Sequence, residues 1–317
     1  MKSSTRVAII GAGNVGASTA YALLMSGVAG EIVLIDANPA KAEGEAMDLE
    51  HALPFTPPTR IFAGDYTHCA TADVIVITAG VGRKPGDSRL DLARNNVAIF
   101  RQIVPRIVAQ NPTGIILVAT NPVDVLTYTV LKISGLDPRR VIGSGTILDT
   151  VRFRFMLSQY FDVDPHSVHA HIIGEHGDTE VPVWSLANIA GMHLASYCKN
   201  RGMEYDREAL HGIFIRTRDA GASVIKRKGA TFYAIAISLS TIIAAILRDQ
   251  NTVFSVSSLI EGYYGISDVC LSLPSVLHRS GIKEVLHLSL SAEEVDLLRH
   301  SANVLKANIA ACQEVRV

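Results

Sequence analysis

The most restrictive feature of the sequence is an alternation of short apolar runs with helical patterns over its first 145 residues. Strands that are apolar on both faces are typical of a parallel sheet covered by helices on both sides. The alternation therefore predicts a doubly wound α/β domain with right-handed crossovers, with a helix over residues 92–110. The expected strands are residues 6–10, 31–35, 74–78, 115–119 and 141–142.

A glycine pattern follows the first expected strand. Gly11, Gly13 and Gly16 fit G-x-G-x-x-G and precede an expected helix over residues 17–25. Such glycines permit a tight turn and the close approach of a pyrophosphate, whose charge lies at the helix N-terminus. Asp36 ends the second expected strand, where a carboxylate accepts hydrogen bonds from both ribose hydroxyls and repels a 2′-phosphate. These features predict a Rossmann domain that binds NAD in preference to NADP; the alternative is an ordinary glycine-rich turn beside an unrelated aspartate.

After residue 145 longer helical patterns replace the alternation. We expect a strand at residues 167–173, and Ser291 and Glu294 have the spacing of a capping box before a final helix. Because no linker rich in proline or glycine separates the halves, two closely packed domains are expected, residues 1–145 and residues 146–317, the second of α+β class. Its other expected helices are residues 153–161, 207–226 and 232–247.

Composition excludes several classes of protein. Lys and Arg total 29, Asp and Glu total 30, and the net charge of −1 does not favour nucleic acid or a membrane surface. Residues 229–247 carry no charge over nearly the length of a bilayer span, but their hydroxyl groups and flanking cations favour a buried helix. With no secretory signal and no paired cysteines, we expect a cytoplasmic protein without disulfides. The four cysteines are Cys69, Cys198, Cys270 and Cys312.

The densest group of reactive side chains is Gly-Glu-His-Gly-Asp-Thr at residues 174–179. His176 stands beside glycine at an expected strand end, where a ligand can approach closely, although a lone histidine is more often structural. Asp149 and Arg152 are three residues apart on an expected helix and therefore share a face, as a plain surface ion pair also would.

A third candidate region is the loop of residues 80–89. It combines three glycines and a proline with Arg83, Lys84 and Arg89, which is typical of a mobile lid that attracts anions. The histidine, cysteine and carboxylate residues nowhere have convincing metal-ligand spacing, so no metal site is expected.

Four motifs together resemble the NAD-dependent L-lactate/L-malate dehydrogenase family, and the resemblance covers essentially the whole chain. They are GAGNVG at 11–16, ATNPVD at 119–124, GSGTILDTVRFR at 143–154 and GEHGDT at 174–179. Taken as a whole, the sequence most resembles bacterial L-lactate dehydrogenases that are activated by fructose 1,6-bisphosphate. The resemblance implies reversible hydride transfer between NADH and pyruvate, giving L-lactate and NAD.

The resemblance also implies roles for individual residues. His176 would be the acid/base, oriented by Asp149, while Arg152 would bind the substrate carboxylate with its planar fork. Arg89 on the lid would stabilise charge that develops on the carbonyl oxygen. The other implied substrate-binding residues are Arg83, Asn121 and Thr231. The implied cofactor-binding residues are Gly11, Gly13, Val15, Gly16, Asp36, Lys41, Tyr66, Gly80, Val81, Ala119, Asn121, Ser144 and Ile235.

Arg83 departs from the lactate branch of this family, which usually has glutamine before the Lys-Pro-Gly of the lid. The malate branch typically has arginine there, paired with the second carboxylate of oxaloacetate. A buried Arg83 against the methyl group of pyruvate would be a desolvated, unpaired charge, unless the side chain turns back to solvent. Asp87 and Thr231 instead match the lactate pattern. Lactate dehydrogenase is favoured by the whole chain, and malate dehydrogenase stays open.

Regulation and assembly can also be inferred by resemblance. Arg154 and His169 match positions that bind fructose 1,6-bisphosphate on a two-fold axis between subunits, which implies an effector-sensitive homotetramer. An intersubunit ion pair of Arg154 beside a merely packed His169 is the alternative. An NAD-dependent glycosidase, which can share the nucleotide domain, is a remote alternative that would need metal ligands.

Overall fold

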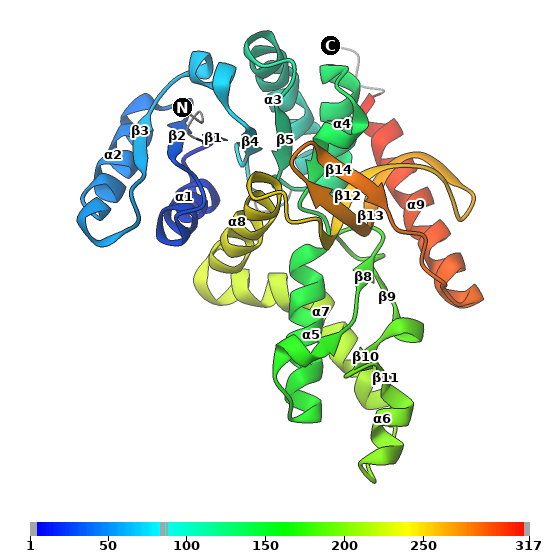
Figure 1. Cartoon of the computed structure of the whole chain (residues 1–317). Helices are drawn as coiled ribbons and strands as arrows, with labels where there is room; N and C mark the ends of the chain where they lie inside the picture. Colours follow the sequence, from blue (N-terminus) through cyan, green and yellow to red (C-terminus); the bar gives the residue numbers. More distant parts are fainter. Residues whose placement is uncertain (1–4, 83–85, 87, 314–317) are drawn as a thin grey trace.

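A parallel sheet forms the centre of the computed structural model, which describes residues 5–82, 86 and 88–313 (Figure 1). Its strand order is β6-β5-β4-β1-β2-β3, and all neighbouring strands in this part run parallel. The predicted doubly wound α/β fold is confirmed. The strands are β1 (Arg6–Ile10), β2 (Glu31–Ile35), β3 (Arg60–Ala63), β4 (Val74–Ile77), β5 (Ile115–Val118) and β6 (Val141–Gly143).

Helices cover both faces of this sheet because successive strand residues point to opposite sides. Val7 and Ile9 of β1 pack in one core with α1 (Asn14–Ser26), α2 (Pro39–Glu50) and α8 (Tyr233–Leu247). Ala8 and Ile10 pack in a second core with α3 (Arg89–Gln110), α4 (Val123–Ser134) and α9 (Ala292–Gln313). Two separate apolar cores on one sheet explain why its strands are apolar on both faces.

The sheet continues into the second half of the chain, which the sequence analysis did not predict. Three antiparallel strands, β12 (Thr252–Tyr263), β13 (Ile266–His278) and β14 (Gly281–Val285), extend it to nine strands in the described part of the chain. The junction is the pairing of Ser257 in β12 with Gly143 in β6. A side chain at Gly143 would be only 2.9 Å from Ser257 Cβ, so glycine permits this close approach.

The remaining elements form a lobe below the sheet in Figure 1, with its own core around Phe153, Leu157 and Phe161. The predicted single strand over residues 167–173 is wrong, because the segment divides into two short strands in different sheets. Between them the guanidinium of Arg154 donates to the Ala170 carbonyl at 2.9 Å, which occupies a group that a sheet partner would use. The elements are α5 (Ile147–Phe161), β7 (Val168–His169), β8 (Ile172–Ile173), β9 (Val181–Pro182), β10 (Asn188–Ile189), β11 (Met192–His193), α6 (Leu194–Asn200) and α7 (Arg207–Lys228).

Local hydrogen bonds define where two of the helices begin. Ser88 caps α3 in a reciprocal capping box with Asp91, so this helix begins three residues earlier than predicted. The predicted capping box before α9 is confirmed: the Ser291 amide donates to Glu294 at 2.8 Å, and the Glu294 amide donates back at 3.3 Å.

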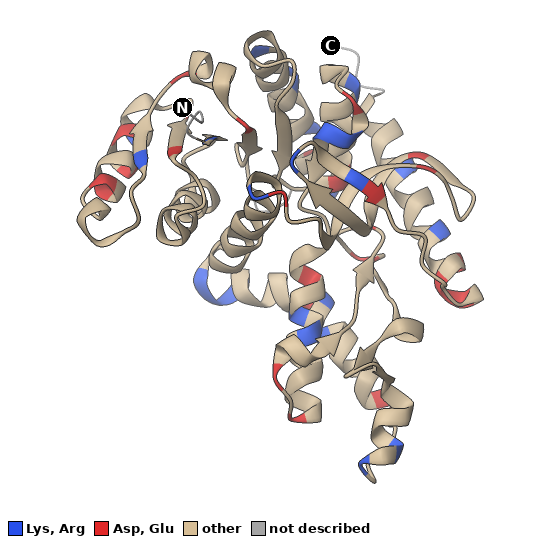
Figure 2. Ribbon diagram, viewed as in Figure 1, with Lys and Arg blue, Asp and Glu red and all other residues tan. Residues whose placement is uncertain are grey.

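Basic and acidic positions are interspersed along the ribbon in Figure 2, around the sheet and in the lower lobe alike. The apolar segment that approaches a bilayer span forms α8, which buries one face against α1. Within the described residues, no helix is long and apolar enough to cross a membrane. All four cysteines are buried and free.

Candidate active site

The carboxyl ends of the parallel strands bring the proposed cofactor-binding residues to one edge of the sheet. After β1 the chain builds β2 and β3 on one side and then crosses to β4 on the other. Such a reversal opens a crevice at the carboxyl ends of the strands, where nucleotides bind in open α/β sheets. Many of the proposed residues follow β1, β2, β4, β5 or β6 closely and therefore lie at the carboxyl ends of the strands, whereas Lys41 lies in α2, Tyr66 follows β3 and Ile235 lies in α8.

The glycine loop after β1 fits a pyrophosphate. A Cβ on Gly16 would lie 1.9 Å from the Gly11 carbonyl oxygen, so the first and third glycines allow α1 to pack tightly on the loop. A Cβ on Gly13 would meet no heavy atom within 4 Å, so the middle glycine faces open space. Gly13 is also the N-cap of α1, and no described side chain caps this helix. Its N-terminal amides and helix dipole can therefore receive a phosphate.

Asp36 braces this loop from the end of β2. Its Oδ2 accepts the Ala12 amide at 2.7 Å and its Oδ1 accepts the Asn38 amide at 2.9 Å. Each carboxylate oxygen retains a lone pair that can accept from a ribose hydroxyl. The ribose-binding role of Asp36 stays a prediction. Lys41 lies exposed in the first turn of α2, and Tyr66 lies beneath the guanidinium of Arg106 at 3.8 Å.

One buried amide side chain connects the loops after β4 and β5. Asn96 of α3 accepts the Val81 amide at 2.8 Å and donates to the Asn121 carbonyl at 2.8 Å. Gly80 lies against the same side chain, since a Cβ there would be 2.9 Å from Asn96 Oδ1. The sequence analysis missed Asn96, whose only signal was an amide on an otherwise apolar helix face. The remaining residues on this edge are Ala119 and Ser144 after the strand ends, Val15 in α1, and half-buried Thr231 and Ile235 at α8.

A buried carboxylate joins the two residues predicted to act on substrate. Asp149 is 2% exposed; its Oδ2 lies 2.5 Å from His176 Nδ1, and its Oδ1 accepts from Arg152 Nη1 at 3.1 Å. Each carboxylate oxygen therefore holds one partner. The histidine approaches from the loop after β8, whereas Asp149 and Arg152 share α5. Within the described residues, His176 Nε2 has no hydrogen-bond partner, so it is available to a ligand.

Two acidic residues that the sequence analysis did not assign also contribute to this site. Asp124 lies in the first turn of α4, and its Oδ2 accepts the His176 backbone amide at 2.8 Å. Glu180 is buried, and its Oε1 has no hydrogen-bond partner in the described part of the chain. The sequence held a signal for both, because Asp124 ends the motif at 119–124 and Glu180 follows the motif at 174–179.

Burial and charge act in opposite directions on the pKa of His176. Burial favours the neutral imidazole, but the adjacent Asp149 carboxylate outweighs it and raises the pKa of His176 to about 9. Burial raises the pKa of Glu180 to about 9, with a further contribution from the charge of Asp149, so this carboxyl is neutral near pH 7. Burial would raise the pKa of Asp149 as well, but His176 and Arg152 hold it below its ordinary value. Near neutral pH the site thus contains a protonated imidazole beside an ionised carboxylate.

The structure brings one lid residue to the catalytic loop. Arg89 begins α3, and its guanidinium pairs with Asp178 at 2.6 Å in an exposed ion pair. Asp178 lies two residues beyond His176, so Arg89 stands at the mouth of the site. Arg83 and Asp87, on which the choice between lactate and malate depends, lie outside the described residues.

The two residues predicted to bind an effector both influence a further histidine, His171. Arg154 bonds to the Ala170 carbonyl, and His169 is exposed in the neighbouring strand β7. Burial, then the charges of Arg154 and His169, lower the pKa of His171 to about 4, so this imidazole is neutral near pH 7. Any attraction for an anion here would therefore come from Arg154 and His169.

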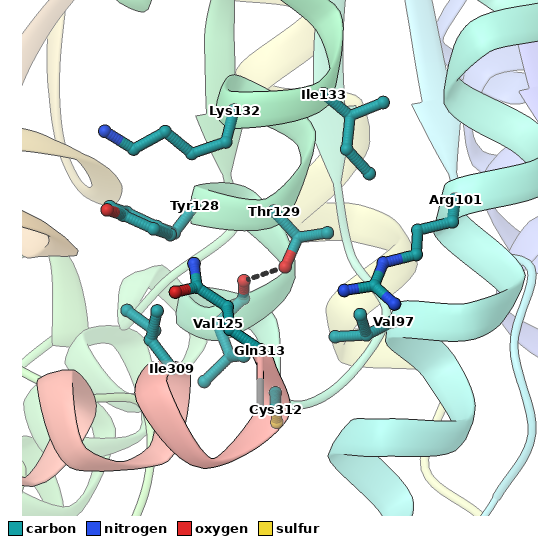
Figure 3. A pocket seen from close by; sticks show the side chains of 10 residues that line it. All are labelled: Val97, Arg101, Val125, Tyr128, Thr129, Lys132, Ile133, Ile309, Cys312 and Gln313. Atoms are coloured by element: carbon teal, nitrogen blue, oxygen red, sulfur yellow. Dashed lines mark hydrogen bonds between the residues drawn. The ribbon is translucent and has the colours of Figure 1, made fainter. Parts of the chain in front are cut away.

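A cavity of about 120 Å³ lies elsewhere, between α3, α4 and α9 (Figure 3). Arg101 and Lys132 lie at its wall, but none of its lining residues is proposed for substrate or cofactor. Among the described residues, no group of three or more His, Cys, Asp or Glu side chains is arranged to hold a metal ion.

Family models match nearly the whole chain. Residues 5–143 match the lactate/malate dehydrogenase NAD-binding domain, and residues 146–315 match the alpha/beta C-terminal domain of the same enzymes. The chain belongs to the lactate/malate dehydrogenase family. It is therefore an NAD-dependent 2-hydroxy acid dehydrogenase.

The most similar relatives and structures include several bacterial enzymes. The chain is 52% identical to an L-lactate dehydrogenase of Geobacillus thermodenitrificans, covering 96% of both chains, and 51% identical to L-lactate dehydrogenase 1 of Bacillus cereus, covering 98% of both. The minor L-lactate dehydrogenase of Enterococcus mundtii in its ligand-bound form is 40% identical, with a TM-score of 0.94 over 99% of both chains. A lactate dehydrogenase from a Medee basin deep-sea metagenome library is 43% identical with the same TM-score, covering 98% of this chain and 99% of that one. These matches favour a dehydrogenase over the NAD-dependent glycosidase.

The His176–Asp149 pair should make stability depend on pH. Because folding raises the pKa of His176, its contribution is complete below the unfolded value near 6.5 and is lost as pH rises through about 9. At about 1.4 kcal/mol per pKa unit, the loss is at most about 3 kcal/mol. Urea unfolding at pH 6.5 and at pH 9.5 measures how far the free energy of unfolding falls between these pH values. This decrease should be larger for the wild type than for D149N. Equal decreases would mean that Asp149 does not hold the proton on His176.

Gly13→Ala should separate folding from cofactor binding. The new methyl group meets no protein atom within 4 Å but occupies the space expected for the pyrophosphate. We expect an unchanged melting temperature and NADH affinity reduced about tenfold or more, as overpacking by about 1–3 kcal/mol implies. Gly44→Ala in α2, which also meets no neighbour, is the matched control that should bind NADH normally. Normal binding by G13A would place the cofactor elsewhere.

Proposed function

We propose that this protein is an L-lactate dehydrogenase that reduces pyruvate to L-lactate with NADH and catalyses the reverse oxidation. The observation that carries the proposal is the buried Asp149 carboxylate, with an acid/base imidazole on one oxygen and a carboxylate-binding guanidinium on the other. The names of the bacterial relatives support the choice of lactate. We further propose that residues 1–145 bind the cofactor and residues 146–317 supply most of the substrate site.

His176 is the proton donor in the reductive direction. Its Nδ1 is held by Asp149, so Nε2 donates a proton to the ketone oxygen and recovers it during oxidation. Asp149 stabilises the imidazolium without taking the proton, because its own pKa is low. The chemistry that NADH supplies when bound is a hydride for the keto carbon. Hydride and proton together convert the ketone into the secondary alcohol.

Arg152 and Arg89 bind and polarise the substrate. Arg152 is only 16% exposed and is fixed by Asp149, which suits its fork to a bidentate grip on the substrate carboxylate. Arg89 exchanges its exposed contact with Asp178 for the ketone oxygen when the lid closes, and it stabilises negative charge there. Asn121 and Thr231 complete the substrate pocket. The NAD-binding residues are those surrounding the crevice at the carboxyl ends of the strands.

His176→Ala should abolish turnover while NADH affinity stays nearly normal, because NADH rests on the glycine loop and Asp36. General acid catalysis contributes about 10²–10⁴-fold to the rate, so kcat should fall by about 10²-fold or more. The matched control is H166A, which removes an exposed histidine that also contacts an aspartate, Asp164, at 2.8 Å. Near-normal turnover by H176A in a stopped-flow assay with pyruvate would refute the assignment.

Oxaloacetate is the second candidate substrate, on the strength of Arg83. Arg83→Gln should raise the ratio of kcat/KM for pyruvate to that for oxaloacetate by about 10²-fold, because it removes a cation suited to a second carboxylate. Steady-state rates with both keto acids measure this ratio directly. An unchanged ratio would mean that Arg83 points away from the substrate.

We also propose a cytoplasmic homotetramer that functions in glycolysis and pyruvate fermentation and responds to fructose 1,6-bisphosphate. Large apolar residues stay exposed on the helices α1, α2, α5, α7 and α8, which favours association with further copies. They include Tyr21, Met25, Met47, Val151, Phe155, Ile225, Tyr233 and Ile237. The effector would join Arg154 and His169 of adjacent subunits, and an anion there would relieve repulsion between the basic groups.

Fructose 1,6-bisphosphate should increase apparent pyruvate affinity and tetramer content, with a stronger response at pH 6 than at pH 8, because the bound anion offsets repulsion between basic groups of adjacent subunits. Binding at the two sites must be reciprocally coupled. Titration of the effector with rate and molecular mass as readouts tests this, and R154Q should abolish the response. R140Q, which changes an arginine outside this cluster, is the control. No response at millimolar effector would leave the site without a regulatory role.

A further inference from the structure

The loop that carries His176 is held from the far end of the chain. Ser301 lies in the middle of α9, is fully buried, and accepts the Glu175 backbone amide through Oγ at 2.8 Å. Glu175 directly precedes His176. The Thr179 hydroxyl lies 3.1 Å from the same Oγ, and Thr179 also donates to the Glu175 carboxylate at 2.5 Å. One serine of α9 therefore meets both ends of the catalytic turn.

The contact is close because the turn has a glycine where it crosses α9. A Cβ on Gly174 would lie 2.8 Å from Ser301 Oγ, so no larger residue fits there without displacement. Gly174 has φ +84, which also favours glycine. On its other side Gly174 exchanges two backbone hydrogen bonds of 2.9 Å with Ser272 of β13. Helix and strand thus enclose the start of the turn.

A second contact joins α9 to the same segment further along the chain. Glu294 lies seven residues before Ser301, hence on the same face of the helix, and accepts the amide and hydroxyl of Ser185 at 2.9 and 2.5 Å. A cavity of about 560 Å³, lined by parts of α7, α9 and residues 178–185, lies beside this segment. Packing is incomplete there, so the Ser301 contacts gain weight in setting the path of the catalytic turn, whereas the Ser185 contact holds a part of the segment nine residues beyond His176.

We propose that Ser301 is a positioning residue for catalysis, which sets the backbone before His176 so that Nδ1 meets the Asp149 carboxylate. This inference rests on the proposed role of His176 as the acid. The imidazole is also faced by Asp124 from α4, Arg152 from α5 and the buried Glu180 of its own segment. Removing the Ser301 acceptor leaves these groups in place and loosens only the turn.

The test compares S301A with S185A, which removes the other hydroxyl contact between α9 and this segment, nine residues beyond His176. Ketone reduction needs protonated His176, so kcat/KM falls as pH rises through its pKa. In S301A the contact between His176 and Asp149 should be looser, so the fall of kcat/KM should occur about one pH unit lower than in the wild type. The less well placed imidazole should also reduce kcat/KM about tenfold near neutral pH. S185A should keep the wild-type limb. In S301C a thiol fills the space of the serine hydroxyl but is only a weak hydrogen-bond acceptor, so this variant should behave like S301A. It replaces S301A in the test if S301A does not fold.

A readout without substrate separates this proposal from the proposed function. Diethylpyrocarbonate reacts with neutral imidazole, so peptide-resolved modification of His176 against pH reports its protonation. S301A should shift this profile to lower pH and S185A should not. An unshifted profile in S301A and S301C would overturn the positioning role, whatever the substrate. A shifted profile without turnover of pyruvate or oxaloacetate by the wild type would overturn the proposed function alone.

Discussion

The active site depends on one buried carboxylate. Asp149 is enclosed in the protein, and its two oxygens hold His176 and Arg152, so a single negative charge orients two groups from different segments. An unpaired buried charge would be costly, which makes both partners part of the stability of the fold as well as of its chemistry. The backbone contacts of Asp124 and Ser301 bring the imidazole to this carboxylate. The ion pair between His176 and Asp149 is therefore supported by residues of α4, α5 and α9, which pack around the sheet.

Local patterns were sufficient to predict five of the six strands in the nucleotide half of the fold, whereas the edge strand β3 was not predicted. Valine-rich and isoleucine-rich runs such as β1 and β4 are short, apolar on both faces and bounded by glycine or polar residues, and each appears where expected. The hairpin β12–β13 was not predicted, although it is longer than any of them. Its place in the sheet depends on the pairing of Ser257 with Gly143 of β6 across more than a hundred residues, which no local pattern encodes. The single strand expected at 167–173 failed because the Arg154 side chain takes the Ala170 carbonyl.

The site could be predicted only in part, for a related reason. Asp149 and Arg152 are close in sequence and His176 lies in a dense motif, so residue types and resemblance were enough to propose them together. Asn96 and Ser301 act through hydrogen bonds to backbone groups, and their residue types alone carry no chemical signature. Ser301 meets Glu175 from 126 residues away. Only the packed structure reveals such second supports of a catalytic loop.

The most direct test of this account is the pKa of His176 in the wild-type protein without substrate, measured by following its ring nitrogens with ¹⁵N NMR over pH 5 to 10. We expect an imidazolium that is stabilised by the ionised Asp149 and that keeps its proton until about pH 9. Titration near the unperturbed value of about 6.5 would contradict it. It would mean that burial and Asp149 cancel and that the carboxylate does not prepare the acid for catalysis.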